Sequence, residues 1–368
     1  MNKTFNIIIA GGKTGGHLFP GIAVAQALER LHDNVNVLFV GTNAPFEVLT
    51  LEKYGYAHNS ILSKPVKGGS ILSKVFSISI LLVSMIQAMM IMKRIKPDFV
   101  LGVGGFSSFA VVLAAWCMGI PTAIQEQNAI PGLTNRLLSK FAKTIFTSFK
   151  ETKGLADNTK VKYVGNPVRK TDPIESGTSL ISNTFNPDKL TLLVTGGSQG
   201  AASINNAFMD ALAMMENTDR FNIIHQTGIK DESAIQQQYA DLEIKATVKA
   251  FFHNMPQLLK MADLAITRAG AGTISELCIM GLPAILVPFP HAADDHQTFN
   301  AKALEDQNAA VMIKDSELTG QTLKKTIQGL VGNKSRLDRM TQMLKRIAMT
   351  HADEKIATCI LKTKDFKV

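Results

Sequence analysis

The stretch that decides the fold is Phe5-Asn6-Ile7-Ile8-Ile9-Ala10-Gly11-Gly12-Lys13-Thr14-Gly15-Gly16-His17, which leads into a helical pattern from Phe19 to Leu31. An apolar run, then glycines, then a helix is typical of the start of a βαβ unit. The same order returns at Leu190–Thr195, followed by Gly196-Gly197-Ser198-Gln199-Gly200-Ala201 and a helix to about Met215. The two glycine runs begin 185 residues apart, which indicates two similar domains rather than a short repeat.

Further apolar segments follow each of these starts. The expected strands are Val35–Val40, Phe99–Val103, Thr122–Gln125 and Thr144–Thr147 in the first half, and Asn222–Gln226, Val248–Phe252, Leu264–Thr267 and Ala284–Val287 in the second. Strands that alternate with helices predict the α/β class, with two Rossmann-like domains built on parallel sheets. Gly165 and Pro167 mark a hinge, and residues 172–188 are predicted to be a loop.

Composition and charge restrict the function. With 46% hydrophobic and 19% charged residues, the 368-residue chain is a folded protein with room for two cores. Three scattered cysteines suggest neither a disulfide framework nor a metal site, and the N-terminus lacks the pattern of a signal peptide. Residues 1–168 hold 17 basic and 8 acidic residues and so carry the whole net charge of +9. This favours an acidic partner, either nucleic acid, anionic lipid or a phosphorylated substrate, over general solubility.

One segment approaches transmembrane length. Val75 to Met92 is free of charged residues and is flanked by Lys74 on one side and Lys93 and Arg94 on the other. It contains serines and lies inside a predicted βαβ unit, which a membrane span would disrupt. We therefore expect a buried or membrane-surface helix whose basic flanks can contact anionic headgroups.

The first glycine loop fits a phosphate site but neither of two familiar fingerprints. A Walker loop needs a glycine where Ile7 stands, and a dinucleotide site needs an acid after the second strand, where the chain reads Val40-Gly41-Thr42-Asn43. Glycines and a helix N-terminus can nevertheless hold a phosphate through backbone N–H groups. His17, at the mouth of this loop, is a candidate general base, with helix capping or packing as the alternative.

Two loops in the second half offer the same chemistry. Ser198 adds a hydroxyl donor to the glycines around it, and Arg268-Ala269-Gly270-Ala271-Gly272-Thr273-Ile274-Ser275-Glu276 again reads as strand, glycines and helix. Glu276, one turn into that helix, can accept hydrogen bonds from two sugar hydroxyls. Its alternative role is compensation of the helix dipole.

Five ordered motifs carry a specific resemblance across nearly the whole chain. They are Gly12–Gly21, Glu126-Gln127-Asn128, Gly165-Asn166-Pro167-Val168-Arg169, Gly196–Ala201 and Arg268–Glu276. Together they resemble the MurG family, whose members add N-acetylglucosamine from UDP-N-acetylglucosamine (UDP-GlcNAc) to lipid I and so form lipid II in peptidoglycan synthesis.

The resemblance implies a GT-B fold with two Rossmann-like domains facing a cleft. Residues 1–165 and a C-terminal helix at about 350–368 would bind the acceptor and the membrane, and residues 166–349 would bind UDP-GlcNAc. Glu276 would take the ribose hydroxyls, and Phe252 would lie against the uracil through its backbone. The residues that would contact the donor are Thr14, Gly15, Gly16, Asn128, Arg169, Ser198, Phe252, Ala271, Gly272, Thr273, Ile274, Ser275, Glu276 and Gln297.

The implied reaction is an inverting transfer to the C4 hydroxyl of the muramyl sugar, with His17 as the first candidate base and Glu126 as the second. No Asp-x-Asp triplet is present, so neither a metal nor a cofactor is expected. The expected partners are UDP-GlcNAc, lipid I, an anionic membrane surface and other cell-wall synthesis proteins. The expected location is the cytoplasmic face of the bacterial inner membrane, as a peripheral protein with a role in cell shape and division.

The sequence departs from the family pattern in three places. Lys13 stands where the family usually has glycine, and Gly102–Phe109 lacks the family's tyrosine and later proline. The segment Pro288–Gln297 is one residue longer than in some relatives, so choosing Gln297 over His296 depends on aligning from Asn300. A sugar-nucleotide 2-epimerase of the same fold is the main alternative. Nucleic-acid binding ranks low, because few aromatic residues are interleaved with the basic ones.

Overall fold

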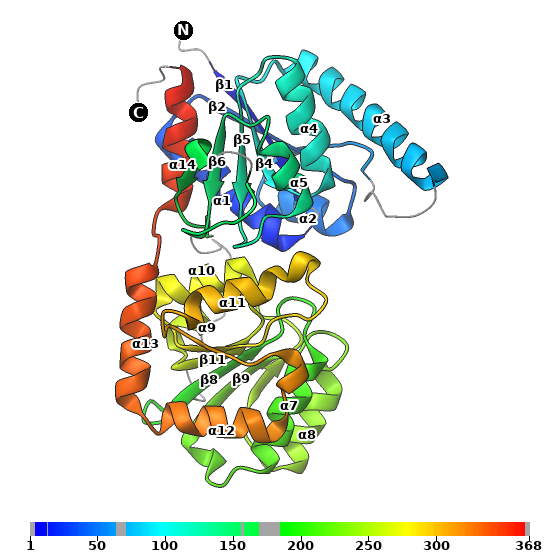
Figure 1. Cartoon of the computed structure of the whole chain (residues 1–368). Helices are drawn as coiled ribbons and strands as arrows, with labels where there is room; N and C mark the ends of the chain where they lie inside the picture. Colours follow the sequence, from blue (N-terminus) through cyan, green and yellow to red (C-terminus); the bar gives the residue numbers. More distant parts are fainter. Residues whose placement is uncertain (1–3, 13, 64–70, 156–157, 169–184, 365–368) are drawn as a thin grey trace. The chain divides into compact units, whose positions relative to one another are not determined.

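The computed structural model describes residues 4–12, 14–63, 71–155, 158–168 and 185–364 (Figure 1). Two compact units make up the chain. The first comprises residues 1–170 together with 350–368, and the second comprises residues 171–349.

The first unit is a seven-stranded parallel sheet with the strand order β3-β2-β1-β4-β5-β6-β7. Its strands are β1 (Phe5–Gly11), β2 (Val35–Gly41), β3 (Ala57–Ser60), β4 (Phe99–Gly104), β5 (Thr122–Glu126), β6 (Thr144–Thr147) and β7 (Val161–Tyr163). Its helices are α1 (Gly15–Leu31), α2 (Pro45–Lys53), α3 (Ile71–Ile95), α4 (Phe106–Cys117), α5 (Leu133–Leu138) and α14 (Ala352–Leu361).

Both faces of this sheet are covered, which explains why β1 is apolar at nearly every position. Successive side chains of a strand point to opposite faces. Ile7 and Ile9 accordingly pack in the cluster formed with α1 and α14, whereas Ile8 packs in the cluster formed with α3 and α4. Ile356 and Ile360 of α14 are fully buried in the first cluster, so this helix belongs to the core of the first unit.

The second unit is a six-stranded parallel sheet with the order β10-β9-β8-β11-β12-β13. Its strands are β8 (Leu190–Thr195), β9 (Phe221–Gln226), β10 (Thr247–Lys249), β11 (Leu264–Thr267), β12 (Ala284–Leu286) and β13 (Val311–Met312). Its helices are α7 (Ala202–Ala213), α8 (Glu232–Asp241), α9 (Met255–Met261), α10 (Ala271–Met280), α11 (His296–Glu305), α12 (Gly320–Val331) and α13 (Lys334–Ile347).

All the predicted strands are present, and the predicted α/β class is confirmed. Three details were wrong or missed. Helix α1 begins at Gly15 rather than Phe19, because Thr14 is its N-cap and the glycines form its first turn. The strand predicted at Val248–Phe252 ends at Lys249. The edge strands β3, β7 and β13 are too short or too polar for their patterns to stand out. Of the predicted loop at 172–188, residues 172–184 lie outside the described residues.

The strand order fixes where ligands can bind. In each sheet the order reverses at one pair of neighbours, β1 and β4 in the first unit and β8 and β11 in the second. Ligands of open α/β sheets bind at the carboxyl ends of the strands at such a switch point. The glycine loops that the sequence singles out follow β1, β8 and β11 and therefore lie at these two positions.

Candidate functional site

The loops after β1 and β4 touch each other at the switch point of the first unit. Gly11 has a φ of +114°, and a Cβ there would lie 2.1 Å from the carbonyl oxygen of Gly104. Only glycine allows this approach. A Cβ at Gly104 would in turn lie 2.6 Å from Cδ2 of the His17 ring. The two glycines therefore make the space in which the His17 imidazole packs.

The His17 ring is also held from its own helix. Its Nδ1 lies 3.1 Å from Oγ1 of the N-cap residue, Thr14. His17 is the third residue of α1 and is half-buried, while Thr14 and Gly16 are exposed. The contact at Nδ1 and the packing of the ring against Gly104 orient the imidazole, as a general base requires. Lys13 lies outside the described residues.

Glu126, the second candidate base, ends β5 and is 1% exposed. Its carboxylate accepts hydrogen bonds from the backbone N–H of Asn128 at 2.9 Å, from Nδ2 of Asn135 at 2.8 Å and from the N–H of Gly132 at 3.3 Å. Burial raises the pKa of Glu126, and the Asn128 and Asn135 donors oppose that rise. These contacts hold the loop that carries Asn128, which is itself half-buried.

The phosphate-type loop of the second unit follows β8. The N–H of Gly197 donates to Oγ1 of Thr195 at 3.1 Å, and Ser198 is exposed at the tip. Gly200 has a φ of +75°, and a Cβ there would lie 2.0 Å from the carbonyl oxygen of Thr227. The loop therefore rests on the segment that follows β9, with the Ser198 side chain at the surface.

The third loop leads from β11 into α10, whose N-cap is Gly270. The helix starts at Ala271, so the N–H groups of its first turn have no partner within the helix and can bind an anion. The remaining candidates of this run, from Gly272 to Glu276, all lie on α10, and Glu276 is half-buried. The side chain of Ser275 donates to the carbonyl of Ala271 at 2.9 Å.

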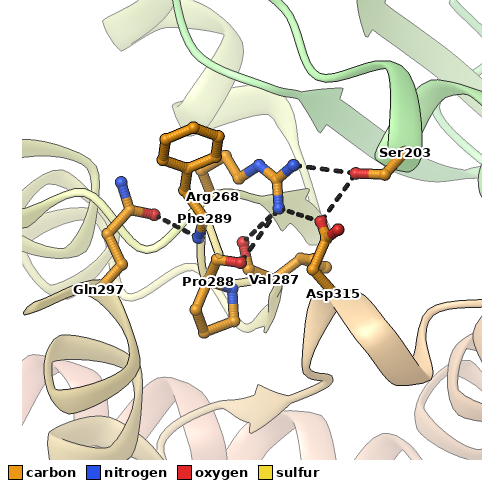
Figure 2. A network of polar contacts seen from close by, with 7 residues as sticks. All are labelled: Ser203, Arg268, Val287, Pro288, Phe289, Gln297 and Asp315. Carbon is orange, nitrogen blue, oxygen red and sulfur yellow. Dashed lines mark hydrogen bonds and ion pairs between the residues drawn. The ribbon is translucent and has the colours of Figure 1, made fainter. Parts of the chain in front are cut away.

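Arg268 organises the base of this loop (Figure 2). Its Nη1 lies 2.5 Å from Oδ1 of Asp315, and its Nη2 donates to Oγ of Ser203 at 2.9 Å. Nη1 also donates to the carbonyls of Val287 and Pro288 at 3.2 and 3.1 Å. The guanidinium thus joins its own loop to the start of α7, to the segment after β12 and to the turn at Asp315. The sequence singled out Arg268 only as the first residue of a motif, and nothing in it indicated these partners.

Gln297, a predicted donor contact, borders this network. Its Oε1 accepts from the backbone N–H of Phe289 at 3.0 Å, and Phe289 follows the two residues whose carbonyls bind Arg268 (Figure 2). The neighbouring His296 turns its Nδ1 to the carbonyl of Ala293 at 2.7 Å. The amide of Gln297, not the imidazole of His296, is therefore the group tied to the Arg268 loop.

Phe252 is 3% exposed, so its ring offers little surface to a ligand. Its N–H already donates to Oε1 of Gln226, so contact between the uracil and the backbone of Phe252 stays a prediction. The last of the predicted donor residues, Arg169, lies outside the described residues. Within the part of the chain that the structure describes, no three His, Cys, Asp or Glu side chains are grouped as metal ligands would be.

Two family models match the chain. The glycosyltransferase family 28 N-terminal domain matches residues 7–147, and the glycosyltransferase family 28 C-terminal domain matches residues 191–356.

Two curated relatives bear the name UDP-N-acetylglucosamine–N-acetylmuramyl-(pentapeptide) pyrophosphoryl-undecaprenol N-acetylglucosamine transferase. The one from Myxococcus xanthus is 40% identical and covers 95% of this chain and 91% of its own. The one from Syntrophus aciditrophicus is 42% identical and covers 92% of each chain.

Two solved structures are similar over almost the entire length. MurG from Acinetobacter baumannii has a TM-score of 0.79 at 31% identity and covers 97% of this chain and 99% of its own. UDP-GlcNAc 2-epimerase from Neisseria meningitidis, bound to UDP-GlcNAc, has a TM-score of 0.72 at 14% identity and covers 98% and 100%. The second likeness shows the fold alone. The first confirms the predicted GT-B class.

Proposed function

The chain belongs to glycosyltransferase family 28, and from this premise we propose that it transfers N-acetylglucosamine from UDP-GlcNAc to the muramyl sugar of lipid I, releasing UDP. The observation that carries this function is the match, over 95% of the chain, to relatives named for this transfer. The glycine loops at both switch points support it, since they offer backbone N–H groups to diphosphates.

The proposed step is a single displacement with inversion. The C4 oxygen of the acceptor forms a bond to the anomeric carbon of the donor while the bond from that carbon to the phosphate oxygen breaks. His17 takes the hydroxyl proton, and the electron pair leaves with UDP. The N-terminus of α10 and the Ser198 loop stabilise the charge that develops on the diphosphate. We place His17 before Glu126, because the carboxylate of Glu126 already accepts hydrogen bonds from the N–H groups of Asn128 and Gly132 and from Nδ2 of Asn135 on α5.

A transfer assay with labelled UDP-GlcNAc and a lipid I analogue tests the function. The expected result is labelled lipid II together with UDP, both dependent on the acceptor. Release of UDP or formation of an epimerised sugar nucleotide without acceptor would favour the 2-epimerase instead.

We also propose that the first unit binds the acceptor and docks on the anionic membrane that holds it. Helix α3 supports this role. By length and composition it is the single helix in the described residues that could cross a membrane, with a mean hydropathy of 1.7 over Ser77–Ile95. It packs along α4 (Figure 1) and buries Ser84, Ala88 and Met92. A helix that already buries one stripe in the sheet's core is better suited to lie on a membrane than to span it.

The opposite face of α3 is apolar and open. Ile78, Leu82, Ile86 and Met90 recur at every fourth residue and are 55–58% exposed. A row of this kind on a folded protein indicates an interaction site. The exposed Lys93 and Arg94 at the end of α3 add the positive charge that anionic headgroups attract.

Replacing both Leu82 and Ile86 by serine should lower binding to anionic vesicles by roughly tenfold or more, because each apolar side chain contributes ~1.5–3 kcal/mol when fully buried. Flotation with phosphatidylglycerol vesicles measures this loss of binding. Ile229→Ser, at an 84% exposed position in the second unit, is the matched control and should float like the unchanged protein. Unaltered flotation of the double variant would rule out α3 as the docking face.

A further inference from the structure

One buried amide connects two of the segments predicted to hold the donor. Gln226, the last residue of β9, is 2% exposed. Its Nε2 donates to the carbonyl of Gly197 at 3.0 Å and to Oγ1 of Thr195 at 3.1 Å. Its Oε1 accepts from the backbone N–H of Phe252 at 2.9 Å. The same side chain thus touches the phosphate-type loop on one side and the predicted uracil segment on the other.

The hydrogen-bond partners of Gln226 determine the orientation of its side-chain amide. The Phe252 N–H can only donate, so it must meet the amide oxygen, and the Gly197 carbonyl can only accept, so it must meet the amide nitrogen. Both hydrogens of the nitrogen are in use. A glutamate would keep the bond to Phe252 but place its second oxygen against the Gly197 carbonyl, and methionine would lose all three bonds while keeping the length. Glutamine alone satisfies every partner at this buried position.

The surrounding backbone shows why such a link is needed. Strand β10 ends at Lys249, and the backbone pairing beside it continues only to Ala250, which accepts from the N–H of Gly228 at 3.0 Å. Two residues further along, the N–H of Phe252 donates to the side chain of Gln226 instead of to a neighbouring strand. The Gln226 side chain therefore fixes the backbone of Phe252, which lies beyond the last backbone hydrogen bond of this edge of the sheet.

We propose that Gln226 is a positioning residue for the donor, which fixes the spacing between the diphosphate loop at Gly197 and the nucleoside segment at Phe252. This rests on the proposed function, in which both segments bind the UDP part of one molecule. Two binding segments held at the right spacing before the ligand arrives cost less ordering entropy on binding. Gln226 itself touches neither substrate.

A second buried network lies next to Gln226, around His225, but it does not replace the contacts that Gln226 makes. His225 contacts the Tyr239 hydroxyl through Nδ1 at 3.0 Å and Oδ1 of Asn205 through Nε2 at 3.1 Å, and burial lowers its pKa to about 3. The imidazole is therefore neutral. Nδ2 of Asn205 donates to the carbonyl of Thr227 at 3.0 Å. This network fixes the residue after Gln226 but reaches neither Gly197 nor Phe252 directly.

The test compares UDP binding and transfer kinetics in the full chain. In Gln226→Met, the Kd for UDP measured by calorimetry should rise about tenfold, because three buried hydrogen bonds are lost. The KM for UDP-GlcNAc should rise in parallel. The kcat at saturating donor should fall less than about threefold, and the acceptor KM should not change, since a positioning residue acts on donor binding.

Tyr239→Phe is the matched control, because it removes one buried hydrogen bond to His225 from the same core without touching the two donor segments. It should lower the melting temperature yet bind UDP within about twofold of the unchanged protein. Thr195→Val is the second test variant if Gln226→Met does not fold. It keeps the shape but removes the oxygen that accepts from Gln226 and Gly197, and it should weaken UDP binding by about threefold.

The outcomes separate the inference from the function on which it rests. An unchanged protein that neither binds UDP nor transfers sugar would overturn the proposed function. An active protein whose Gln226→Met variant binds UDP within about twofold would overturn the positioning role alone, as would a Tyr239→Phe variant that weakens UDP binding equally. If only Thr195→Val can be measured, unchanged UDP binding overturns the proposal.

Discussion

Replacing His17 by alanine is expected to reduce kcat by roughly 10²–10⁴-fold, the usual contribution of a positioned general base. The imidazole is oriented by Thr14 at Nδ1 and by the glycine backbone at Gly104 against its ring. Alanine removes the proton acceptor and leaves the helix intact. The KM for UDP-GlcNAc should change little, because the proposed donor site lies mainly in the second unit. Initial rates with a lipid I analogue at saturating donor measure the loss.

A matched control stands at the other end of the same helix. His32 is the C-cap residue of α1, and its replacement by alanine should leave kcat within about twofold. Thr14→Val should lie between the two variants, since it removes the hydroxyl at Nδ1 but keeps the imidazole. Near-normal turnover of His17→Ala would show that another group accepts the proton, and Glu126 would then be the next residue to replace.

The framework of the fold could be predicted because its signals are local. Ile7, Ile8 and Ile9 are apolar in succession, which is typical of a strand covered on both faces, and the glycines after them mark the turn into a helix. The parallel sheets and the position of the glycine loops follow from these signals. The edge strand β3 could not be found in this way, since Ala57-His58-Asn59-Ser60 has no apolar pattern and depends on pairing with β2.

The site was predictable only in part, for a related reason. Motifs identify residues that are close in sequence, such as Ser198 and its glycines. The contacts that hold those motifs join residues far apart, and no pattern in a single sequence signals them. Arg268 meets Asp315, 47 residues away, and Gln226 meets Gly197, 29 residues away. The family resemblance supplied the candidate ligand contacts, whereas the supporting residues behind them required the structure.

The second large effect is expected from Arg268→Ala, which should lower the free energy of unfolding of the second unit by about 3–5 kcal/mol. The side chains of Arg268 and Asp315 are only 12% and 20% exposed. Alanine would leave the Asp315 carboxylate and the Val287 and Pro288 carbonyls without the guanidinium in a poorly solvated place. Urea unfolding followed by far-UV circular dichroism measures the loss. Lysine should rescue only part of it, because an ammonium cannot direct donors along two edges as guanidinium does.

The exposed pair Lys314 and Glu317, next to this network, provides the control. Their side chains are 59% and 63% exposed, so Lys314→Ala should cost less than about 1 kcal/mol. A double-mutant cycle then decides what Arg268 does. If its main role is to neutralise Asp315, Arg268→Ala should be far less harmful in an Asp315→Ala background, with a coupling of about 1–3 kcal/mol. Additive losses would contradict that role. They would show that Arg268 stabilises the second unit mainly through its hydrogen bonds to the carbonyls of Val287 and Pro288, which precede the contact between Phe289 and Gln297.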